Sequence, residues 1–499
     1  MVGSGIILKR SRSKQRQSFL FSIMIHLWMI LPIFIFSFSL TSCSNNKSKF
    51  PTVPQTVTAT TTGKSVSVET SAAQSSPISI RLAAPLSEET AEYLAKLYTA
   101  KKNDMLGVGI TGQTVSTAFL DTIKTEISVE VISTALTGAN LSAYQTWIQS
   151  GMTPDVLLTD NVTDLMERGY LASVDDIMAG NALLSPANVY PDMIDQFMIE
   201  GQFFGIPYYA SVSIIFINNE VLNSAGFVLP FEADTDAILE AATLVSLLNE
   251  DREDPGSLVI PMYSGTELLP FLPPSFDSDV GYMAEHAGKI DVDSEGFRDS
   301  VQFLRKFDTS FSVSSMSREE RETVFGTFDP ITSKRVAMWV GRSDEIARWS
   351  NYMPFTLGIA QIPSQKAGTL SRPALTVFPL CVSSQSDHPV EAASFAAFIA
   401  LDPDAILLRQ RFENHEGFIP VVKSNDVWDQ CFSNAKYCGS FYKYKGLMSE
   451  AYFCPFVSDP VFDDQTEAFL KRYADIILDK AIDINELFDT IKKNIDEEI

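Results

Sequence analysis

The 499-residue sequence has few residues of the kinds that hold metals or polyanions. It contains four histidines and five cysteines, and His26 lies in an apolar stretch near the start. A zinc site requires closely spaced cysteines with histidines, so we expect no metal site and no cofactor. Lys and Arg total 38 against 62 Asp and Glu, which gives a net charge of −24. A surface this acidic repels phosphate backbones, so we expect no nucleic-acid partner.

Motifs that signal catalysis are also missing from the sequence. It has no nucleophile elbow, no phosphate-binding loop and no metal-binding motif, and it has no internal repeat. A glycosidase would need two carboxylates at a fixed separation, and among 62 acids such pairs can always be nominated. We therefore expect no catalytic residues and a protein that is not an enzyme. A surface glycan-active enzyme is the least favoured alternative.

The start of the chain has the layout of a secretory signal. Basic residues come first, an apolar run extends from Phe19 to Leu40, and the small pair Thr41-Ser42 stands directly before Cys43. The run is also long enough to span a bilayer, so a retained transmembrane anchor is the alternative. Either interpretation places the rest of the chain outside the cytoplasm, because positive charges stay inside.

Leu40-Thr41-Ser42-Cys43 resembles the lipobox of bacterial lipoproteins. The resemblance implies that residues 1–42 are a signal peptide, that Cys43 carries the lipid, and that the protein is anchored to the bacterial cell membrane on its extracytoplasmic side. Residues 43–77 are rich in Ser, Thr, Val and Pro and predict a flexible tether.

The four remaining cysteines leave disulfide pairing open. They are Cys381, Cys431, Cys438 and Cys454. An extracytoplasmic compartment permits disulfides, and Cys431 and Cys438 are close enough in sequence to close a small loop. Cys454 is an alternative partner for either, and spacing does not decide between them.

From residue 78 onward, short strands alternate with amphipathic helices. Strands are predicted over 78–83, 127–131, 155–159 and 357–362, and Ser87 is placed to cap a helix. Helices are predicted to start at His388-Pro389 and Asp402-Pro403, and two more end the chain. This alternation predicts an α/β fold with largely parallel sheets.

Four segments in this region resemble one family, the extracellular solute-binding proteins of ABC importers, of the carbohydrate type that includes maltodextrin binders. They are Ser150-Gly151-Met152-Thr153-Pro154-Asp155, Gly201-Gln202-Phe203-Phe204-Gly205-Ile206-Pro207-Tyr208, Lys334-Arg335-Val336-Ala337-Met338-Trp339 and Gly417-Phe418-Ile419-Pro420. The resemblance extends over residues 78–499 and rests on the order and separation of the segments.

The resemblance implies the two-lobed periplasmic-binding-protein fold, with a hinge that the chain crosses three times and a ligand cleft between the lobes. Lobe I is expected over 78–209 and 380–424, and lobe II over 210–379 and 425–499, with separate sheets. The implied function is capture of a sugar or oligosaccharide and its delivery to an ABC permease by a monomer. Alternatives are a sensory protein that serves a membrane receptor, and a binder of a non-sugar solute.

The resemblance also implies a set of ligand-binding residues at strand ends and hinge crossings. A sugar site requires aromatic faces and polar partners for hydroxyl groups. The expected residues are Asp160, Tyr208, Tyr209, Tyr263, Arg342, Asp344 and Phe378. Relatives often carry a tryptophan just after the strand that ends near Gly341; here either Trp349 replaces it, or Arg342 and Asp344 make a more polar site.

Residues 428–462 are dense in aromatic side chains. One interpretation is a disulfide-stapled surface insertion that packs on itself, and the other is a segment that overhangs the ligand cleft. The first is favoured by the nearby cysteines.

Overall fold

The computed structural model describes residues 77–306 and 312–498. The expected signal peptide, Cys43 and nearly all of the tether lie outside these residues. Within them, no helix is long and apolar enough to cross a membrane.

One mixed sheet organises the fold, in the order β2-β1-β3-β12-β6-β10-β7, with β11 on β6 and β13 on β12. Its strands are β1 (Ile78–Ala84), β2 (Ile127–Ser133), β3 (Val156–Leu158), β6 (Gly205–Asn218), β7 (Ile260–Met262), β10 (Val336–Arg342), β11 (Leu357–Gln361), β12 (Ala374–Val382) and β13 (Tyr452–Phe453). The pairs β1–β2, β1–β3, β7–β10 and β12–β13 are parallel. The pairs of β6 with β10, β11 and β12, and of β12 with β3, are antiparallel, so the sheet is less parallel than expected.

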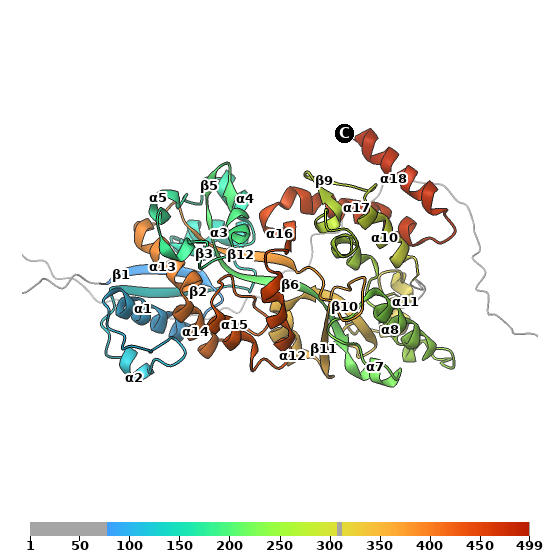
Figure 1. Ribbon diagram of the computed structural model, residues 1–499, viewed down its shortest axis with the longest axis horizontal. Helices are drawn as coiled ribbons and strands as arrows, with labels where there is room; N and C mark the ends of the chain where they lie inside the picture. Colours follow the sequence, from blue (N-terminus) through green and yellow to red (C-terminus); the bar gives the residue numbers. More distant parts are fainter. Residues whose placement is uncertain (1–76, 307–311, 499) are drawn as a thin grey trace, which may run out of the picture. The chain divides into compact units, whose positions relative to one another are not determined.

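Strand β6 connects two groups of strands, as Figure 1 shows. Residues 205–212 pair with β12, and residues 213–218 pair with β10 and β11. The expected separation into two sheets is therefore incomplete, because one long strand belongs to both groups. All 14 residues of β6 are buried, which agrees with its almost uninterrupted apolar sequence. The pairing with β12 shifts register between Phe378 and Pro379, where proline has no N–H to donate.

Helices pack on this sheet and on one another. They are α1 (Glu88–Lys102), α2 (Thr117–Leu120), α3 (Leu141–Ser150), α4 (Val162–Glu167), α5 (Asp175–Met178), α6 (Pro191–Asp195), α7 (Asn219–Ser224), α8 (Thr235–Leu247), α9 (Pro273–Phe276), α10 (Glu295–Leu304), α11 (Arg318–Phe325), α12 (Ile346–Tyr352), α13 (Pro389–Leu401), α14 (Pro403–Phe412), α15 (Asn425–Phe432), α16 (Pro455–Ser458), α17 (Pro460–Leu478) and α18 (Ile484–Glu498). For example, α13 contacts β6 and β12, whereas α18 contacts α17. Ser87 caps α1 by accepting from the Thr90 amide, and Asp402 caps α14, as predicted from the sequence. Two small hairpins, β4–β5 (Met198–Ile199, Gln202–Phe203) and β8–β9 (Glu285–His286, Lys289–Ile290), lie outside the main sheet.

The buried side chains form two large clusters, one on each group of strands. The first includes β1, β3, the first part of β6 and α13, and the second includes α8, α10, α17 and the buried face of α18. Two hydrophobic cores that share one pair of long strands are typical of a two-lobed fold, and here β6 and β12 form the hinge.

The packing of the C-terminal region differs from the expected lobe II segment 425–499. Trp428 is fully buried in the first cluster, and its indole N–H donates to the Val422 carbonyl at 2.9 Å. Apart from Tyr452 and Cys454, which form a small cluster with Ala374, the buried apolar residues from Val427 to Val457 belong to the first cluster, and those from Phe462 onward belong to the second. The chain therefore passes from the first cluster to the second near residue 458 rather than near residue 424. The lobe boundaries themselves stay a prediction.

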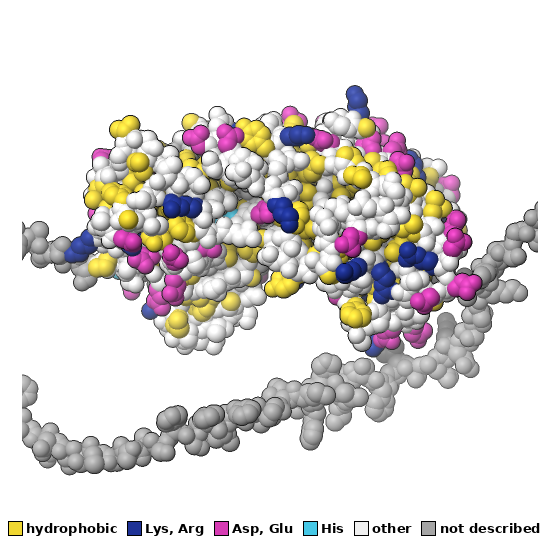
Figure 2. Space-filling view, turned by 90° about the horizontal axis from the view of Figure 1, so that it is seen from below, with side chains coloured by type: hydrophobic (Ala, Val, Ile, Leu, Met, Phe, Trp, Pro, Cys, Tyr) yellow, Lys and Arg dark blue, Asp and Glu magenta, His cyan; other side chains and the backbone are white. Residues whose placement is uncertain are grey.

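The aromatic segment is not a self-contained insertion. Its buried rings Phe432, Phe441 and Tyr444 join the first core cluster, and the four described cysteines are free thiols. The disulfide staple that favoured a separate insertion is therefore not formed. On the face drawn in Figure 2, acidic and basic side chains are interspersed with hydrophobic ones.

Candidate functional site

A stack of aromatic rings lies where β6 and β12 pair. Tyr209 lies between Phe378, with ring centroids 4.8 Å apart, and Phe418, at 4.1 Å, and all three are buried. Phe378 faces Tyr209 because the two residues are directly opposite on neighbouring strands. His415 continues the stack on Phe418 at 4.5 Å. The Tyr209 hydroxyl donates to the Leu136 carbonyl at 2.7 Å, so this ring joins the hinge strand to the loop after β2.

Arg342 and Asp344 form a two-pronged ion pair at the end of β10. Arg342 Nε lies 3.1 Å from Asp344 Oδ1, and Nη2 lies 3.2 Å from Oδ2. Asp344 is fully buried and also accepts from the Ser211 hydroxyl at 2.6 Å, whereas the Arg342 side chain is 27% exposed. Burial lowers the pKa of Arg342, but Asp344, together with Glu345 and Tyr209, more than offsets this effect, so the net pKa is raised. The guanidinium is therefore charged, fixed in direction and still accessible.

Two aromatic rings lie against this guanidinium. Its carbon is 5.3 Å from the centroid of Phe378 and 5.7 Å from that of Phe456, within the range of cation–π contacts. Phe456 belongs to α16, which contacts α4, the helix that begins just after Asp160. Phe456 is 38% exposed. Sequence reasoning missed it as a site residue, although it lies in the aromatic segment whose second interpretation was an overhang of the cleft.

Asp160 follows the C-terminal end of β3, where ligand loops of α/β sheets lie. One of its carboxylate oxygens, Oδ1, is buried without a hydrogen-bond partner. Burial raises its pKa, and contacts including Thr137 and the charge of Arg342 oppose the rise. A carboxylate with an unused acceptor atom is suited to a ligand that donates from hydroxyl groups.

The structure thus brings together Asp160, Tyr209, Arg342, Asp344 and Phe378. Burial and then the charge of Asp344 raise the pKa of Tyr209, with Arg342 opposing and Asp160 adding to the rise, so these groups influence one another. We call these five residues and Phe456 the hinge cluster.

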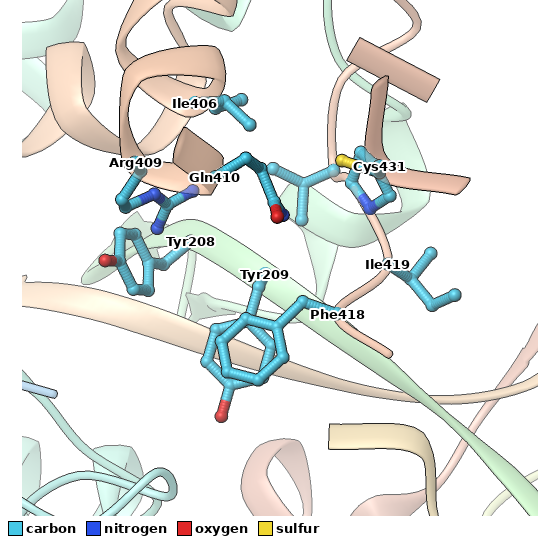
Figure 3. A pocket seen from close by; sticks show the side chains of 10 residues that line it. Tyr208, Tyr209, Ile406, Arg409, Gln410, Phe418, Ile419 and Cys431 are labelled. Carbon is cyan, nitrogen blue, oxygen red and sulfur yellow. The ribbon is translucent and has the colours of Figure 1, made fainter. Parts of the chain in front are cut away.

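Tyr208 is not counted in the hinge cluster, although its ring contacts that of Tyr209 edge to face, with centroids 5.9 Å apart. Tyr208 lies at the register shift between β6 and β12, where the regular alternation of side chains is interrupted. It is 1% exposed, and the Arg409 guanidinium lies over its ring at 3.9 Å from the centroid. Figure 3 shows this pair at the edge of a small cavity.

Tyr263 follows β7 and is half-buried. Its ring packs against the small cluster around Ile260 and also against the first core cluster. Its backbone N–H donates to the Met338 carbonyl at 2.9 Å. No contact of Tyr263 with the hinge cluster is found among the described residues.

Trp349 does not replace the missing tryptophan plate in the hinge cluster. It packs against Trp339 and Phe216, with ring centroids 6.1 and 6.5 Å apart, respectively. The second expected alternative was a more polar site made by Arg342 and Asp344. These two residues form the ion pair, and the Arg342 guanidinium lies over the ring of Phe378.

Glu267 lies in the 3-10 helix η3 (Thr266–Phe271) after Tyr263. Its side chain reaches solvent, yet surrounding protein raises the pKa of its carboxyl to about 7. Near neutral pH such a carboxyl both accepts and donates hydrogen bonds. No sequence pattern marks it. Across the residues that the structure describes, no group of three His, Cys, Asp or Glu is placed to hold a metal.

Comparison with known proteins gives a family and a fold. A model of the family described as bacterial extracellular solute-binding protein matches residues 117–425. No curated protein sequence matches.

Several solved structures share the fold. An ABC substrate-binding protein from Listeria monocytogenes, solved in complex with cycloalternan, is 15% identical with a TM-score of 0.55, covering 85% of this chain and 99% of that one. The sugar-binding protein MalE from Xanthomonas citri is 15% identical with a TM-score of 0.54, covering 84% of this chain and 96% of its own. UgpB from Mycobacterium tuberculosis, in complex with glycerophosphocholine, is 15% identical with a TM-score of 0.52 and coverage of 85% and 98%.

At this identity the solved structures establish the fold, which is the expected two-lobed α/β fold, and the family model covers well over half of the chain. The protein belongs to the family of bacterial extracellular solute-binding proteins.

Proposed function

We propose that the protein captures a sugar or oligosaccharide outside the cytoplasm and delivers it to an ABC permease. The observation that carries the proposal is the hinge cluster, in which an unpartnered carboxylate oxygen, a fixed and accessible guanidinium and a partly exposed aromatic ring meet. Aromatic faces pack against the C–H surface of a sugar, and the charged groups hydrogen-bond its hydroxyls. Similar structures bind cycloalternan or maltotetraose, which supports the same ligand class.

The ligand site in this proposal consists of Asp160, Arg342 and Phe456, supported by Tyr209, Asp344 and Phe378. Asp344 holds Arg342 in place, and Phe378 supports the guanidinium from beneath. Binding without chemistry suffices, so the protein is proposed not to be an enzyme. Tyr263 and Glu267 are proposed as outer contacts, and Tyr208 is assigned no contact with the sugar.

A non-sugar solute is the second candidate. One solved neighbour binds glycerophosphocholine, whose polyol part would use the same hydroxyl acceptors. In both cases we propose that Cys43 carries a lipid that keeps the monomeric protein at the membrane.

The test is a thermal-shift screen of mono- and oligosaccharides and glycerophosphodiesters, followed by titration calorimetry on the best ligand. Phe456→Ala and Asp160→Asn should each weaken binding about tenfold or more, since loss of an anchor contact costs on the order of 1.4 kcal/mol or more. Phe328→Ala is the matched control, because Phe328 is 71% exposed and is not part of the hinge cluster. Unchanged affinity in both site variants contradicts the placement of the site. Stabilisation by peptides or polyamines alone contradicts the ligand class.

A further inference from the structure

An uncharged segment follows helix α1. Residues 105–120 contain no Asp, Glu, Lys, Arg or His, although Asp, Glu, Lys and Arg make up 20% of the chain. Three large apolar side chains at the start of this segment are exposed: Met105 is 48% exposed, Ile110 is 41% exposed, and Val108 is fully exposed. Exposed apolar groups that lie together mark contact sites for proteins or membranes. We call residues 105–110 the apolar loop.

A tight turn forms the tip of the apolar loop. The Gly107 carbonyl accepts a hydrogen bond from the Ile110 N–H at 3.1 Å, which places Val108 and Gly109 at the tip. Gly109 has φ +77°, a conformation that glycine adopts without strain. The turn therefore presents the Val108 side chain to the outside in one fixed arrangement, with no side chain of its own at Gly109.

The base of the apolar loop is held by helices on both sides. The Met105 N–H donates to the Ala100 carbonyl in α1 at 2.8 Å. Beyond the loop, the Gly112 N–H donates to the Asp404 carboxylate at 2.9 Å, and a Cβ added at Gly112 would lie 1.7 Å from the Asp404 carbonyl oxygen. Lys101 also pairs with Asp404 at 2.6 Å, so α1 and α14 fix the same base. A contact made by the loop therefore requires little further ordering of the chain.

The apolar loop lies at the end of the sheet where the chain enters β1. Lys102, at the end of α1, pairs with the Glu126 carboxylate at 2.7 Å, and the Glu126 carbonyl accepts from the Ile78 N–H at 2.9 Å. Strands β1 and β2 run parallel from Ile78 and Ile127 onward, and this end of the sheet is at the left of Figure 1. Asp160 follows β3, which is parallel to β1, so the hinge cluster lies towards the opposite end.

The route of the chain to β1 connects this end with the membrane. The inference rests on the part of the proposed function that assigns a lipid to Cys43. The 34 residues 44–77 span at most about 120 Å when fully extended, so they do not fix which face of the protein meets the bilayer. They join the folded protein at Ile78, close to the base of the apolar loop. A weak contact made by a tethered protein benefits from an effective concentration in the millimolar range.

The size and chemistry of the apolar loop favour a lipid surface over a protein partner. A stable protein interface of standard size uses about 20–30 residues a side, and the loop offers three exposed apolar side chains. A few apolar side chains suffice to enter the head-group region of a bilayer, to a depth of about 5–10 Å. The loop has no charged side chain that could pair with a partner, and Asp104 directly before it disfavours anionic head groups.

We propose that the apolar loop inserts Met105, Val108 and Ile110 into the head-group region of the membrane that holds the lipid anchor. The partner is a zwitterionic lipid surface, and the contact depends little on salt because the loop is uncharged. It keeps the folded protein at the membrane in which the permease lies and leaves the hinge cluster uncovered.

The direct test is tryptophan quenching by brominated lipids. The full lipid-bearing protein with Val108→Trp is reconstituted into phosphatidylcholine vesicles whose acyl chains carry bromine near the head group. We expect most of the fluorescence that the substitution adds to be quenched, at low and at high salt. Val228→Trp is the matched control, because Val228 is 77% exposed in the loop after α7 and its added fluorescence should stay unquenched.

A second substitution tests the apolar mechanism. Adding Ile110→Asp to Val108→Trp should relieve the quenching, because a carboxylate resists transfer out of water. If the fluorescence added by Val108→Trp is quenched no more than that added by Val228→Trp, the proposal is overturned. Quenching that disappears at high salt indicates electrostatic attraction and overturns it as well. Unquenched vesicles combined with slower solute uptake by cells that carry Val108→Asp identify the permease as the partner, which also overturns it.

Two further measurements separate this inference from the proposed function. Mass spectrometry of the mature N-terminus shows whether Cys43 carries lipid; absence of the lipid contradicts the anchor and removes the basis of this inference with it. Titration calorimetry should give the parent's sugar affinity for both Val108→Asp and Val228→Asp, since neither residue belongs to the hinge cluster. Quenching without sugar binding contradicts only the proposed ligand, and sugar binding by a lipid-bearing protein without quenching contradicts only the membrane contact.

Discussion

Replacing Asp344 by Asn tests whether the ion pair of the hinge cluster holds β6 and β10 together. Asp344 is fully buried and accepts from the Ser211 hydroxyl on β6 and from two nitrogens of Arg342 on β10. The amide has nearly the same volume as the carboxylate, so little packing is lost. The change removes the charge and turns one acceptor atom into a donor group that faces the Arg342 guanidinium.

The expected loss of stability follows from these contacts. A hydrogen bond to a charged group contributes about 1.5–3 kcal/mol, and breaking a buried ion pair costs about 3–5 kcal/mol. Because Arg342 is 27% exposed, water replaces part of what it loses. We therefore expect Asp344→Asn to lower the free energy of unfolding by about 3 kcal/mol.

Urea denaturation at neutral pH measures this loss of stability. A double-mutant cycle shows how much of it comes from the ion pair between Arg342 and Asp344. Asp475→Asn on the exposed face of α17 is the control for loss of an acid and should change stability by less than about 0.5 kcal/mol. The cycle with Arg342→Gln should give a coupling energy of about 2 kcal/mol between residues 342 and 344. A coupling below about 0.5 kcal/mol would refute the reasoning, because the ion pair would then not be what stabilises the junction.

Three further predictions concern other parts of the chain. Burial lowers the pKa of His415 to about 3 in the folded protein, against about 6.5 in the unfolded chain. As pH drops from about 6.5 to about 3, the unfolded chain is protonated at His415 while the folded protein is not, so the free energy of unfolding falls. The loss attributable to His415 approaches about 5 kcal/mol, and His415→Gln should remove that part of the pH dependence in urea titrations at several pH values. Gly417→Ala should destabilise the fold by more than about 2 kcal/mol in the same assay, because Gly417 has φ +92° and an added Cβ would lie 1.9 Å from the Ser343 carbonyl oxygen. Cys43→Ala should leave the chain unprocessed, and incorporation of labelled fatty acid by this variant would disprove lipidation at Cys43.

Local sequence signals predicted much of the secondary structure. The cap at Ser87, the strand starting at Ile78 and the helix starting at Pro389 all appear as expected. Each depends on side chains within a few residues of one another, and such interactions can be read along the chain. The position of Asp160 after a short apolar strand was recognisable for the same reason.

The sequence alone did not separate Tyr208 from Tyr209. Both were expected at the ligand, and their rings contact each other edge to face beside the register shift of β6 and β12. Which ring lies near Arg342 depends on β10, and which ring lies under Arg409 depends on α14, and both elements are distant in the sequence. The aromatic segment 428–462 was misjudged for a similar reason. A high content of aromatic residues does not reveal whether the rings pack on one another or join a core formed by residues far away in the sequence.

The sequence by itself determined the acidic composition, the alternation of strands and helices, and the family. Only the tertiary structure decided that β6 belongs to both groups of strands, that Phe456 reaches Arg342, and that Arg409 is buried against the ring of Tyr208. The physical reason is that these features are contacts between residues remote along the chain, and such contacts depend on which strands pair and which helices cover them.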